Sequence, residues 1–291
     1  MDIHTKERYR RWVKQKIRRR IGFMLIILWL LVNTILMFAL FFNRGTCECP
    51  DGSYHLDSEA NSIEAEDENE EREDLTQNAN VIPGRYAFLT FDDGPTAYTQ
   101  KILDVLYERN APAIFFVIGD HITGRTDSSQ LLNRMLEEGH YIGLHTMTHD
   151  HTTLYIGEGA PLRFVNEMFE LNQLIYSITG GFSTDLCRAA YGSSGTFTPE
   201  HHIAVDNAGL YCIDWNIDSR DWQQRTAYMV FYNVTSQIER LNFPDELVIL
   251  FHEYLWTIEA LPEIIDYLRY HGYTIVEYTP GDHLTYYRTI N

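Results

Sequence analysis

Residues 86–95 read Tyr-Ala-Phe-Leu-Thr-Phe-Asp-Asp-Gly-Pro, an apolar run that ends in two adjacent carboxylates and a Gly-Pro turn. Tyr86–Phe91 has the length and composition of a buried strand. We therefore expect the carboxylates of Asp92 and Asp93 at the carboxyl end of that strand. By itself an Asp-Asp pair before Gly-Pro is typical of a turn with a helix cap. Whether this pair is catalytic depends on the rest of the sequence.

The same pattern of apolar runs and helix-period stretches continues along the chain. Six further runs of strand length are Ala113–Ile118, Tyr141–His145, Leu186–Arg188, Tyr211–Trp215, Leu247–His252 and Tyr273–Glu277. Seven strands that alternate with helices predict parallel pairing through right-handed crossovers, hence a barrel or a doubly wound sheet. Reactive residues follow several of these strands, and the carboxyl ends of barrel strands converge on one mouth. We therefore expect an α/β fold, a distorted and incomplete (β/α) barrel with about seven parallel strands.

Two histidines, His145 and His149, follow the third predicted strand at i and i+4. In a helical turn this spacing brings both imidazoles to one face and to one metal ion. With one carboxylate of the Asp-Asp pair they make a facial triad that leaves positions open for water or substrate. The second carboxylate is then free to act as a base.

Five spaced motifs between Arg85 and Tyr278 resemble the polysaccharide deacetylases, carbohydrate esterase family 4, also called the NodB homology domain. The motifs are Asp92-Asp93, the pair His145 and His149, Arg188-Ala189-Ala190-Tyr191, Asp221-Trp222 and Leu250-Phe251-His252. In the family the third motif is Arg, any residue, Pro, Tyr, so this chain departs from it at Ala190. Proline stiffens a turn, so the change to alanine affects how firmly the orientation of the Tyr191 backbone N–H is fixed.

The resemblance implies a metal-dependent hydrolase that acts on carbon–nitrogen bonds other than peptide bonds. It makes Asp92 the general base. It makes Asp93, His145 and His149 the ligands of a divalent metal, zinc foremost, with cobalt, nickel or manganese as alternatives. The metal polarises an acetamide carbonyl and makes water a stronger acid. His252 is implied as the acid that protonates the departing amine.

The resemblance also assigns supporting roles. Arg188 is expected to hold Asp92 ionised and oriented, and Asp221 to do the same for the imidazolium of His252. The backbone N–H of Tyr191, which would also contact substrate, is expected to stabilise the oxyanion. Leu250 and Trp222 are expected to form the walls of the acetyl pocket.

An uncharged run of 22 residues, 21–42, predicts one transmembrane helix ahead of the barrel. At ~1.5 Å per residue it spans the ~30 Å core of a bilayer. A cleaved signal peptide is the main alternative, but it has a shorter apolar region and a small-residue cleavage site. Residues 1–20 carry nine basic side chains. By the positive-inside rule we expect them in the cytoplasm and the catalytic domain outside the cell membrane.

Residues 43–84 predict an acidic, disordered linker. Twelve of the residues 48–74 are acidic and only Arg72 is basic, so this stretch cannot bury enough apolar area to fold. A cation-binding or partner-binding tail is the alternative. The expected organisation is a basic cytoplasmic tail (1–20), a transmembrane helix (21–42), the linker (43–84) and the deacetylase domain (85–291).

The formal net charge of −18 makes nucleic acid a poor partner. The family resemblance implies a polysaccharide substrate instead. Our leading hypothesis is removal of N-acetyl groups from a cell-envelope polysaccharide, foremost N-acetylglucosamine of peptidoglycan. An O-deacetylase of an acetylated polysaccharide and a catalytically inactive carbohydrate-binding module are the alternatives. Cys187 and Cys212 fall in runs predicted as neighbouring strands, so they could form a disulfide or stay as two free thiols.

Overall fold

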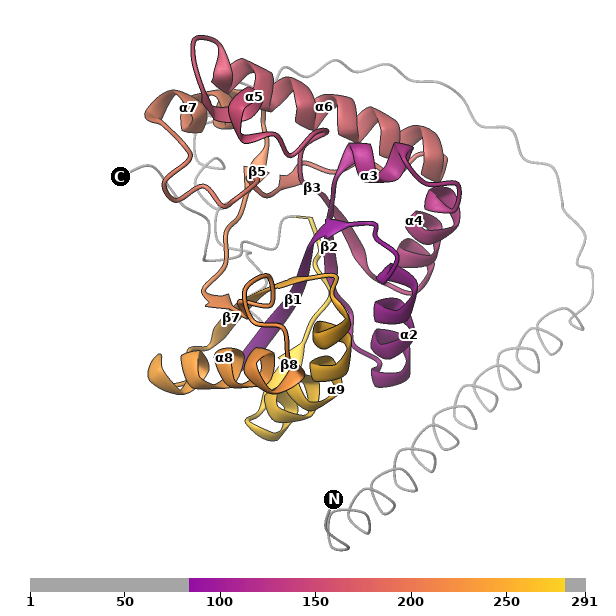
Figure 1. Cartoon of the computed structure of the whole chain (residues 1–291), viewed down its shortest axis with the longest axis vertical. Helices are drawn as coiled ribbons and strands as arrows, with labels where there is room; N and C mark the ends of the chain where they lie inside the picture. Colours follow the sequence, from indigo (N-terminus) through magenta and orange to yellow (C-terminus); the bar gives the residue numbers. More distant parts are fainter. Residues whose placement is uncertain (1–83, 281–291) are drawn as a thin grey trace, which may run out of the picture. The chain divides into compact units, whose positions relative to one another are not determined.

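The computed structural model of the chain describes residues 84–280 (Figure 1). All seven predicted strands lie in one parallel sheet. The strand order is β5-β4-β3-β2-β1-β7-β6, and β8 pairs with β1. The strands are β1 Arg85–Gly94, β2 Ile114–Val117, β3 Tyr141–Leu144, β4 Leu186–Cys187, β5 Tyr211–Cys212, β6 Ile217–Asp218, β7 Glu246–His252 and β8 Tyr273–Ile275. Within this part of the chain the outer strands β5 and β6 do not pair with each other. The barrel is therefore incomplete, as predicted.

The sequence pattern misses one strand, β6, which pairs in parallel with β7. Ile217 lies opposite Ile249 and Asp218 opposite Leu250. The strands β4 and β5 are equally short but lie within apolar runs of the sequence, whereas Ile217 stands between Asn216 and Asp218, so β6 shows no apolar run. The sheet of the described residues consequently has eight strands where the sequence predicts about seven.

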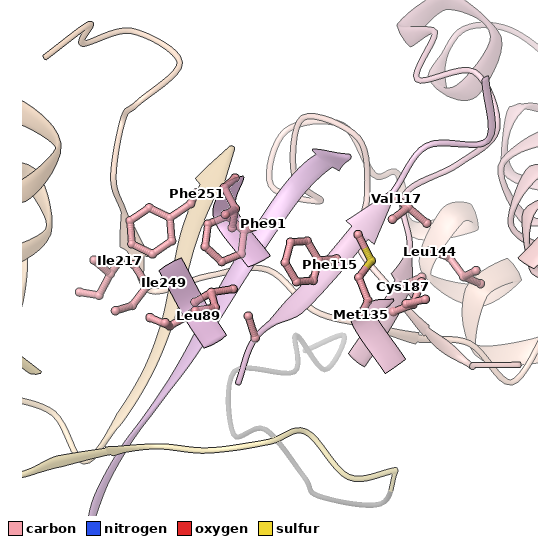
Figure 2. Close-up of a cluster of buried hydrophobic side chains, with 14 of the residues drawn as sticks. Leu89, Phe91, Phe115, Val117, Met135, Leu144, Cys187, Ile217, Ile249 and Phe251 are labelled. Carbon is pink, nitrogen blue, oxygen red and sulfur yellow. The ribbon is translucent and has the colours of Figure 1, made fainter. Parts of the chain in front are cut away.

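Helices connect the strands and pack on the outer face of the sheet (Figure 1). They are α2 Thr99–Arg109, α3 Gly119–Thr123, α4 Ser128–Glu137, α5 His151–Tyr155, α6 Ala160–Thr179, α7 Pro199–Asn207, α8 Ala227–Arg240 and α9 Leu255–Tyr270. Their apolar stripes cover a core in which the ring of Phe91 stacks between those of Phe115 and Phe251, with centroids 5.2 and 5.4 Å away. Figure 2 shows these three rings in one layer across β2, β1 and β7.

The alternation of side chains along each strand decides which residues face the barrel interior. In β1, Leu89 and Phe91 join the outer core, whereas Phe88 belongs to the inner cluster. Thr90 and Asp92 share the parity of Phe88 and so face inward. The same alternation applies to the last residue of β7, His252, and to the residues that follow β3 and β4, His145 and Arg188. The sheet thereby directs these polar side chains to one mouth.

Cys187 and Cys212 are free cysteines that lie opposite each other in the register of β4 and β5. The strands are neighbours, as predicted, and the pair is not bridged. The predicted cytoplasmic tail, transmembrane helix and linker lie outside the described residues. Among residues 84–280 no helix is both long enough and apolar enough to cross a membrane.

Candidate active site

A β-bulge at the end of β1 allows two neighbouring aspartates to reach one site. Asp92 pairs with Phe116 and Gly94 with Val117, so Asp93 is the extra residue of the bulge. Its φ of 67° lies in the left-handed region. In a regular strand adjacent side chains point to opposite faces, and the bulge removes this restriction. Both carboxylates therefore turn toward the mouth.

The predicted histidine pair reaches the site through a loop. His145 follows β3 and His149 precedes α5, and the residues between them are not helical. Thr146 and His149 have φ values of 69° and 55°. The helical turn that the i, i+4 spacing allows does not form, because these left-handed residues interrupt it, yet the two imidazoles lie with centroids 5.1 Å apart.

Asp93, His145 and His149 form a cluster that fits a divalent cation. The Nε2 atoms of both histidines lie 3.4 Å from Oδ1 of Asp93, and one ligand atom from each residue can be chosen within 4.8 Å of the others. Two ligand atoms on a tetrahedral zinc at ~2.1 Å would themselves be about 3.4 Å apart. Asp93 Oδ1 is buried and has no hydrogen-bond partner. A cation would satisfy this atom.

The surroundings of the cluster set the protonation states of His145 and Asp93. Nδ1 of His145 lies 2.9 Å from the carbonyl oxygen of Arg188, so it donates its proton there and leaves the Nε2 lone pair toward Asp93. Burial raises the pKa of the Asp93 carboxyl. The neighbouring imidazoles of His145, His252 and His149 lower that pKa by more. Asp93 is therefore ionised, as a ligand must be.

Asp92 is held by a buried guanidinium. Nη1 of Arg188 donates to Asp92 Oδ1 at 2.8 Å and to Thr90 Oγ1 at 2.7 Å. The guanidinium is itself fixed 4.2 Å above the ring of Phe116. This leaves Asp92 Oδ2 facing the cluster, 3.8 Å from His145 Nε2.

His252 lies opposite Asp92 in the register of β1 and β7 and is paired with Asp221. Its Nδ1 lies 2.7 Å from Asp221 Oδ1, and its Nε2 faces Asp93 Oδ2 at 3.9 Å. Burial lowers the pKa of His252. The hydrogen bond and charge of Asp221, with the charges of Asp92 and Asp93, raise it by more, to about 9. His252 is thus an imidazolium at neutral pH.

Tyr191 lies beside the histidine loop in a left-handed conformation, with φ 65°. Its ring centroid is 4.4 Å from that of His149, and its hydroxyl donates to the His149 carbonyl at 2.9 Å. Within residues 84–280 its backbone N–H has no protein acceptor. Leu250 is buried on the inner face of β7, next to Thr90. Trp222 follows Asp221, and its side chain is exposed.

Comparison with known proteins agrees with this geometry. The family model described as polysaccharide deacetylase matches residues 79–212. The chain is 34% identical over 206 residues to the peptidoglycan-N-acetylglucosamine deacetylase of Bacillus cereus, covering 68% of this chain and 71% of that protein. The chain belongs to the polysaccharide deacetylase family.

Two further relatives support the family assignment. The putative polysaccharide deacetylase YheN of Bacillus subtilis is 36% identical over 190 residues, which span 64% of this chain and 64% of YheN. The crystal structure of the polysaccharide deacetylase Bc1974 from Bacillus cereus superposes with a TM-score of 0.61 at 33% identity, covering 68% of this chain and 94% of Bc1974. The described sheet thus has the family's fold.

In this polysaccharide deacetylase the turn with Ala190 in place of the family's proline is held by side chains. The Tyr155 hydroxyl donates to the Ala190 carbonyl at 2.8 Å. The Asp214 carboxylate accepts from the N–H and the hydroxyl of Ser193, at 3.0 and 2.5 Å. These contacts hold the turn around Tyr191 from both sides.

Sequence reasoning misses several residues that hold the site. Thr90 shares the guanidinium of Arg188 with Asp92, and Thr257 donates to Asp221 Oδ2 at 2.8 Å. The carboxylate of Glu167, on α6, accepts hydrogen bonds from the histidine loop. Glu167 does leave a signal in the sequence, since it is an acid within the apolar stripe of Phe164 and Met168.

Proposed function

We propose that this chain is a metal-dependent hydrolase that removes N-acetyl groups from a cell-envelope polysaccharide, foremost from N-acetylglucosamine of peptidoglycan. One observation carries the proposal. Asp92 Oδ2 and His252 Nε2 lie at the Asp93–His145–His149 cluster, 3.8 Å from His145 Nε2 and 3.9 Å from Asp93 Oδ2 respectively. A carboxylate with one free oxygen and a protonated imidazole are the base and the acid that amide hydrolysis needs.

The residues at the cluster divide the reaction between them. Asp93, His145 and His149 would hold a divalent cation, which when bound would supply Lewis acidity for the acetyl carbonyl and for water. Asp92 accepts the proton of the attacking water through Oδ2, since Arg188 occupies Oδ1. The new carbon–oxygen bond places negative charge on the carbonyl oxygen, which the Tyr191 N–H is free to bind.

Breaking the carbon–nitrogen bond then requires a proton. An amide nitrogen leaves as a neutral amine, and His252 supplies that proton from Nε2 while Asp221 stabilises the ring from Nδ1. The products are acetate and a free sugar amine. Leu250 and Trp222 bound the acetyl group in this proposal.

The choice of peptidoglycan is supported by the Bacillus cereus relative, which is a peptidoglycan-N-acetylglucosamine deacetylase. It is also supported by the predicted membrane segment. In the proposed arrangement the N-terminus is cytoplasmic, residues 21–42 cross the membrane once, and the catalytic domain is extracellular on the acidic linker. A flexible linker of that length reaches ~35 Å. The domain would then act on polymer close to the outer face of the membrane.

The test is mass spectrometry of muropeptides from cells with the gene, without it, and with Asp92→Asn in its place. We expect deacetylated glucosamine only where the intact gene is expressed. Unchanged acetylation of both wall sugars, despite confirmed expression, would reject peptidoglycan as the substrate. Loss of O-acetyl groups with N-acetyl groups intact would identify an O-deacetylase instead.

A further inference from the structure

Two loops carry the three residues of the candidate metal site, and each loop rests on a buried carboxylate outside the cluster. Glu167 lies on α6 and is 8% exposed, and Glu253 follows β7 and is 3% exposed. Burying an acidic side chain costs free energy unless its oxygens are hydrogen-bonded. The partners of these two carboxylates therefore indicate what they do.

Glu167 holds the loop between His145 and His149. Its Oε2 accepts from the backbone N–H groups of Met147 and Thr148, both at 3.0 Å. Its Oε1 accepts from the hydroxyl of Thr148 at 2.9 Å. These donors all lie between the two ligand histidines. Both carboxylate oxygens are thus engaged with the loop.

Glu253 holds the turn that follows Asp93. Its Oε2 accepts from the N–H and the hydroxyl of Thr96, at 2.9 and 2.7 Å, and from the hydroxyl of Thr99. Its Oε1 is buried without a partner. A Cβ on Gly94 would lie 2.5 Å from Oε1, so only glycine lets the turn approach this closely. The carboxylate therefore packs directly under the residue next to Asp93.

Both loops need external support because their conformations are unfavourable on their own. Asp93, Thr146 and His149 have φ values of 67°, 69° and 55°, in a region that residues other than glycine rarely adopt. A ligand loop that relaxed from this conformation would move its donor atoms apart. The metal would then have to reorganise the loop on binding.

We infer that Glu167 and Glu253 are positioning residues that hold the two loops in their metal-binding shape, so that metal affinity depends on both. The inference rests on the metal-dependent function proposed above. Groups that orient metal ligands from outside typically change metal affinity 10–100-fold. Neither glutamate is itself a ligand in this arrangement.

The test is a zinc titration of the metal-stripped full chain in detergent, using a competing chelator. In Glu167→Gln an NH₂ group replaces one acceptor oxygen and cannot accept from the loop. We expect this variant to bind zinc about 10–100-fold more weakly than wild type. For Glu253 the variant is Glu253→Ala, because only Oε2 of Glu253 accepts hydrogen bonds and the amide oxygen of a glutamine could replace it; we expect the same direction. The matched controls are Glu170→Gln on α6 and Glu259→Ala on α9, both exposed, which should bind like wild type.

Thermal unfolding of the same metal-free proteins separates positioning from simple stabilisation. A purely structural role would lower the melting temperature and leave the zinc dissociation constant of the folded protein unchanged, and that result would overturn the inference. Thr148→Ala serves if a glutamine variant does not fold, because it removes one donor and leaves Glu167 in place. It should weaken zinc binding to a smaller extent, and wild-type affinity in Thr148→Ala would count against the role of Glu167.

Acetate release distinguishes this inference from the proposed function. Suppose that the wild type releases no acetate but its variants bind zinc more weakly than it does. That result would support the positioning role and reject the deacetylase. If the wild type is active and its Glu167 and Glu253 variants bind zinc normally, the deacetylase is supported and the positioning role is rejected. A wild type that binds none of zinc, cobalt, nickel and manganese would overturn both.

Discussion

At the scale of single residues, Asp92 and Asp93 differ in role because their surroundings differ. One oxygen of Asp92 accepts a hydrogen bond from the buried guanidinium of Arg188. Asp93 instead directs an unpartnered oxygen at His145 and His149. A bulge of one residue produces this separation. Substitutions at Asp92 and at Asp93 should accordingly impair different properties of the protein.

Substitution should separate metal binding from turnover. We expect His145→Ala to lose bound metal and activity together, because it removes a donor atom of the cluster. Asp92→Asn should retain the metal and lose about 10²–10⁴-fold in kcat, because only the base is removed. Metal analysis of the purified variants and initial rates check both. Stoichiometric zinc in a His145→Ala/His149→Ala double variant would contradict the assigned site.

The pH dependence should report the His252–Asp221 pair. Because the pKa of His252 is raised to about 9, its proton is available at neutral pH, and kcat should fall as the pH rises through that value. Asp221→Asn removes the main group that raises this pKa, so the alkaline limb should move toward lower pH. The double variant with His252→Ala should lose little more than His252→Ala alone. An alkaline limb that stays in place in Asp221→Asn would contradict the coupling.

At the scale of elements, the turn after β4 carries the departure of this chain from the family's third motif, Ala190 in place of proline. Tyr155, from α5, donates to the buried carbonyl of Ala190. Tyr155→Phe leaves that carbonyl unsatisfied, which should lower the free energy of unfolding by about 1–3 kcal/mol. It should also lower kcat, because the turn that aims the Tyr191 amide loosens. Denaturant unfolding and initial rates measure the two effects.

A second substitution tests the explanation. Ala190→Pro, added to Tyr155→Phe, restores the residue that the family pattern has at this position and should recover part of the lost kcat. If Tyr155→Phe leaves both stability and kcat unchanged, side-chain contacts do not replace the proline.

The elements that sequence reasoning predicts well are those with several residues of a regular pattern. The seven predicted strands are all present, because long apolar runs such as Leu247–His252 have only one way to be buried in a parallel sheet. The strand β6 is missed because its single apolar residue, Ile217, has polar neighbours on both sides, whereas the equally short β4 and β5 lie within apolar runs. The i, i+4 spacing of His145 and His149 does not reveal that a loop connects them, because left-handed residues such as Thr146 leave no mark in a hydrophobic pattern.

The residues of the site also divide into those that can be placed from the sequence and those that cannot. Asp92, His145, Arg188 and His252 end or follow strands, so the topology alone brings them to one mouth. Glu167 could not be placed from sequence, because its partners lie 19 and 20 residues earlier and meet it only after α6 packs. The bulge at Asp93 is also set by tertiary structure, since neighbouring strands determine its register.

At the scale of the whole molecule, the residues to which we assign catalytic roles all lie among the described residues 84–280. We expect a fragment from about residue 80 onward to fold and to be as active as the full chain in detergent, because the strands and helices of the site begin at Arg85. Circular dichroism and acetate release test this expectation. An inactive or aggregated fragment beside an active full chain would show that the domain boundary is wrong.

The central claim is that Asp92, His252 and a cation bound at Asp93, His145 and His149 together hydrolyse an acetamide. The most direct measurement is acetate release from chitooligosaccharide and peptidoglycan by the purified full chain, metal-stripped and then reloaded with one equivalent of zinc. The account predicts acetate and free amine in equal amounts from the reloaded protein, and none from the stripped protein or from reloaded Asp92→Asn. Equal rates from stripped and reloaded protein, or no acetate from either substrate with one zinc bound per chain, would contradict it.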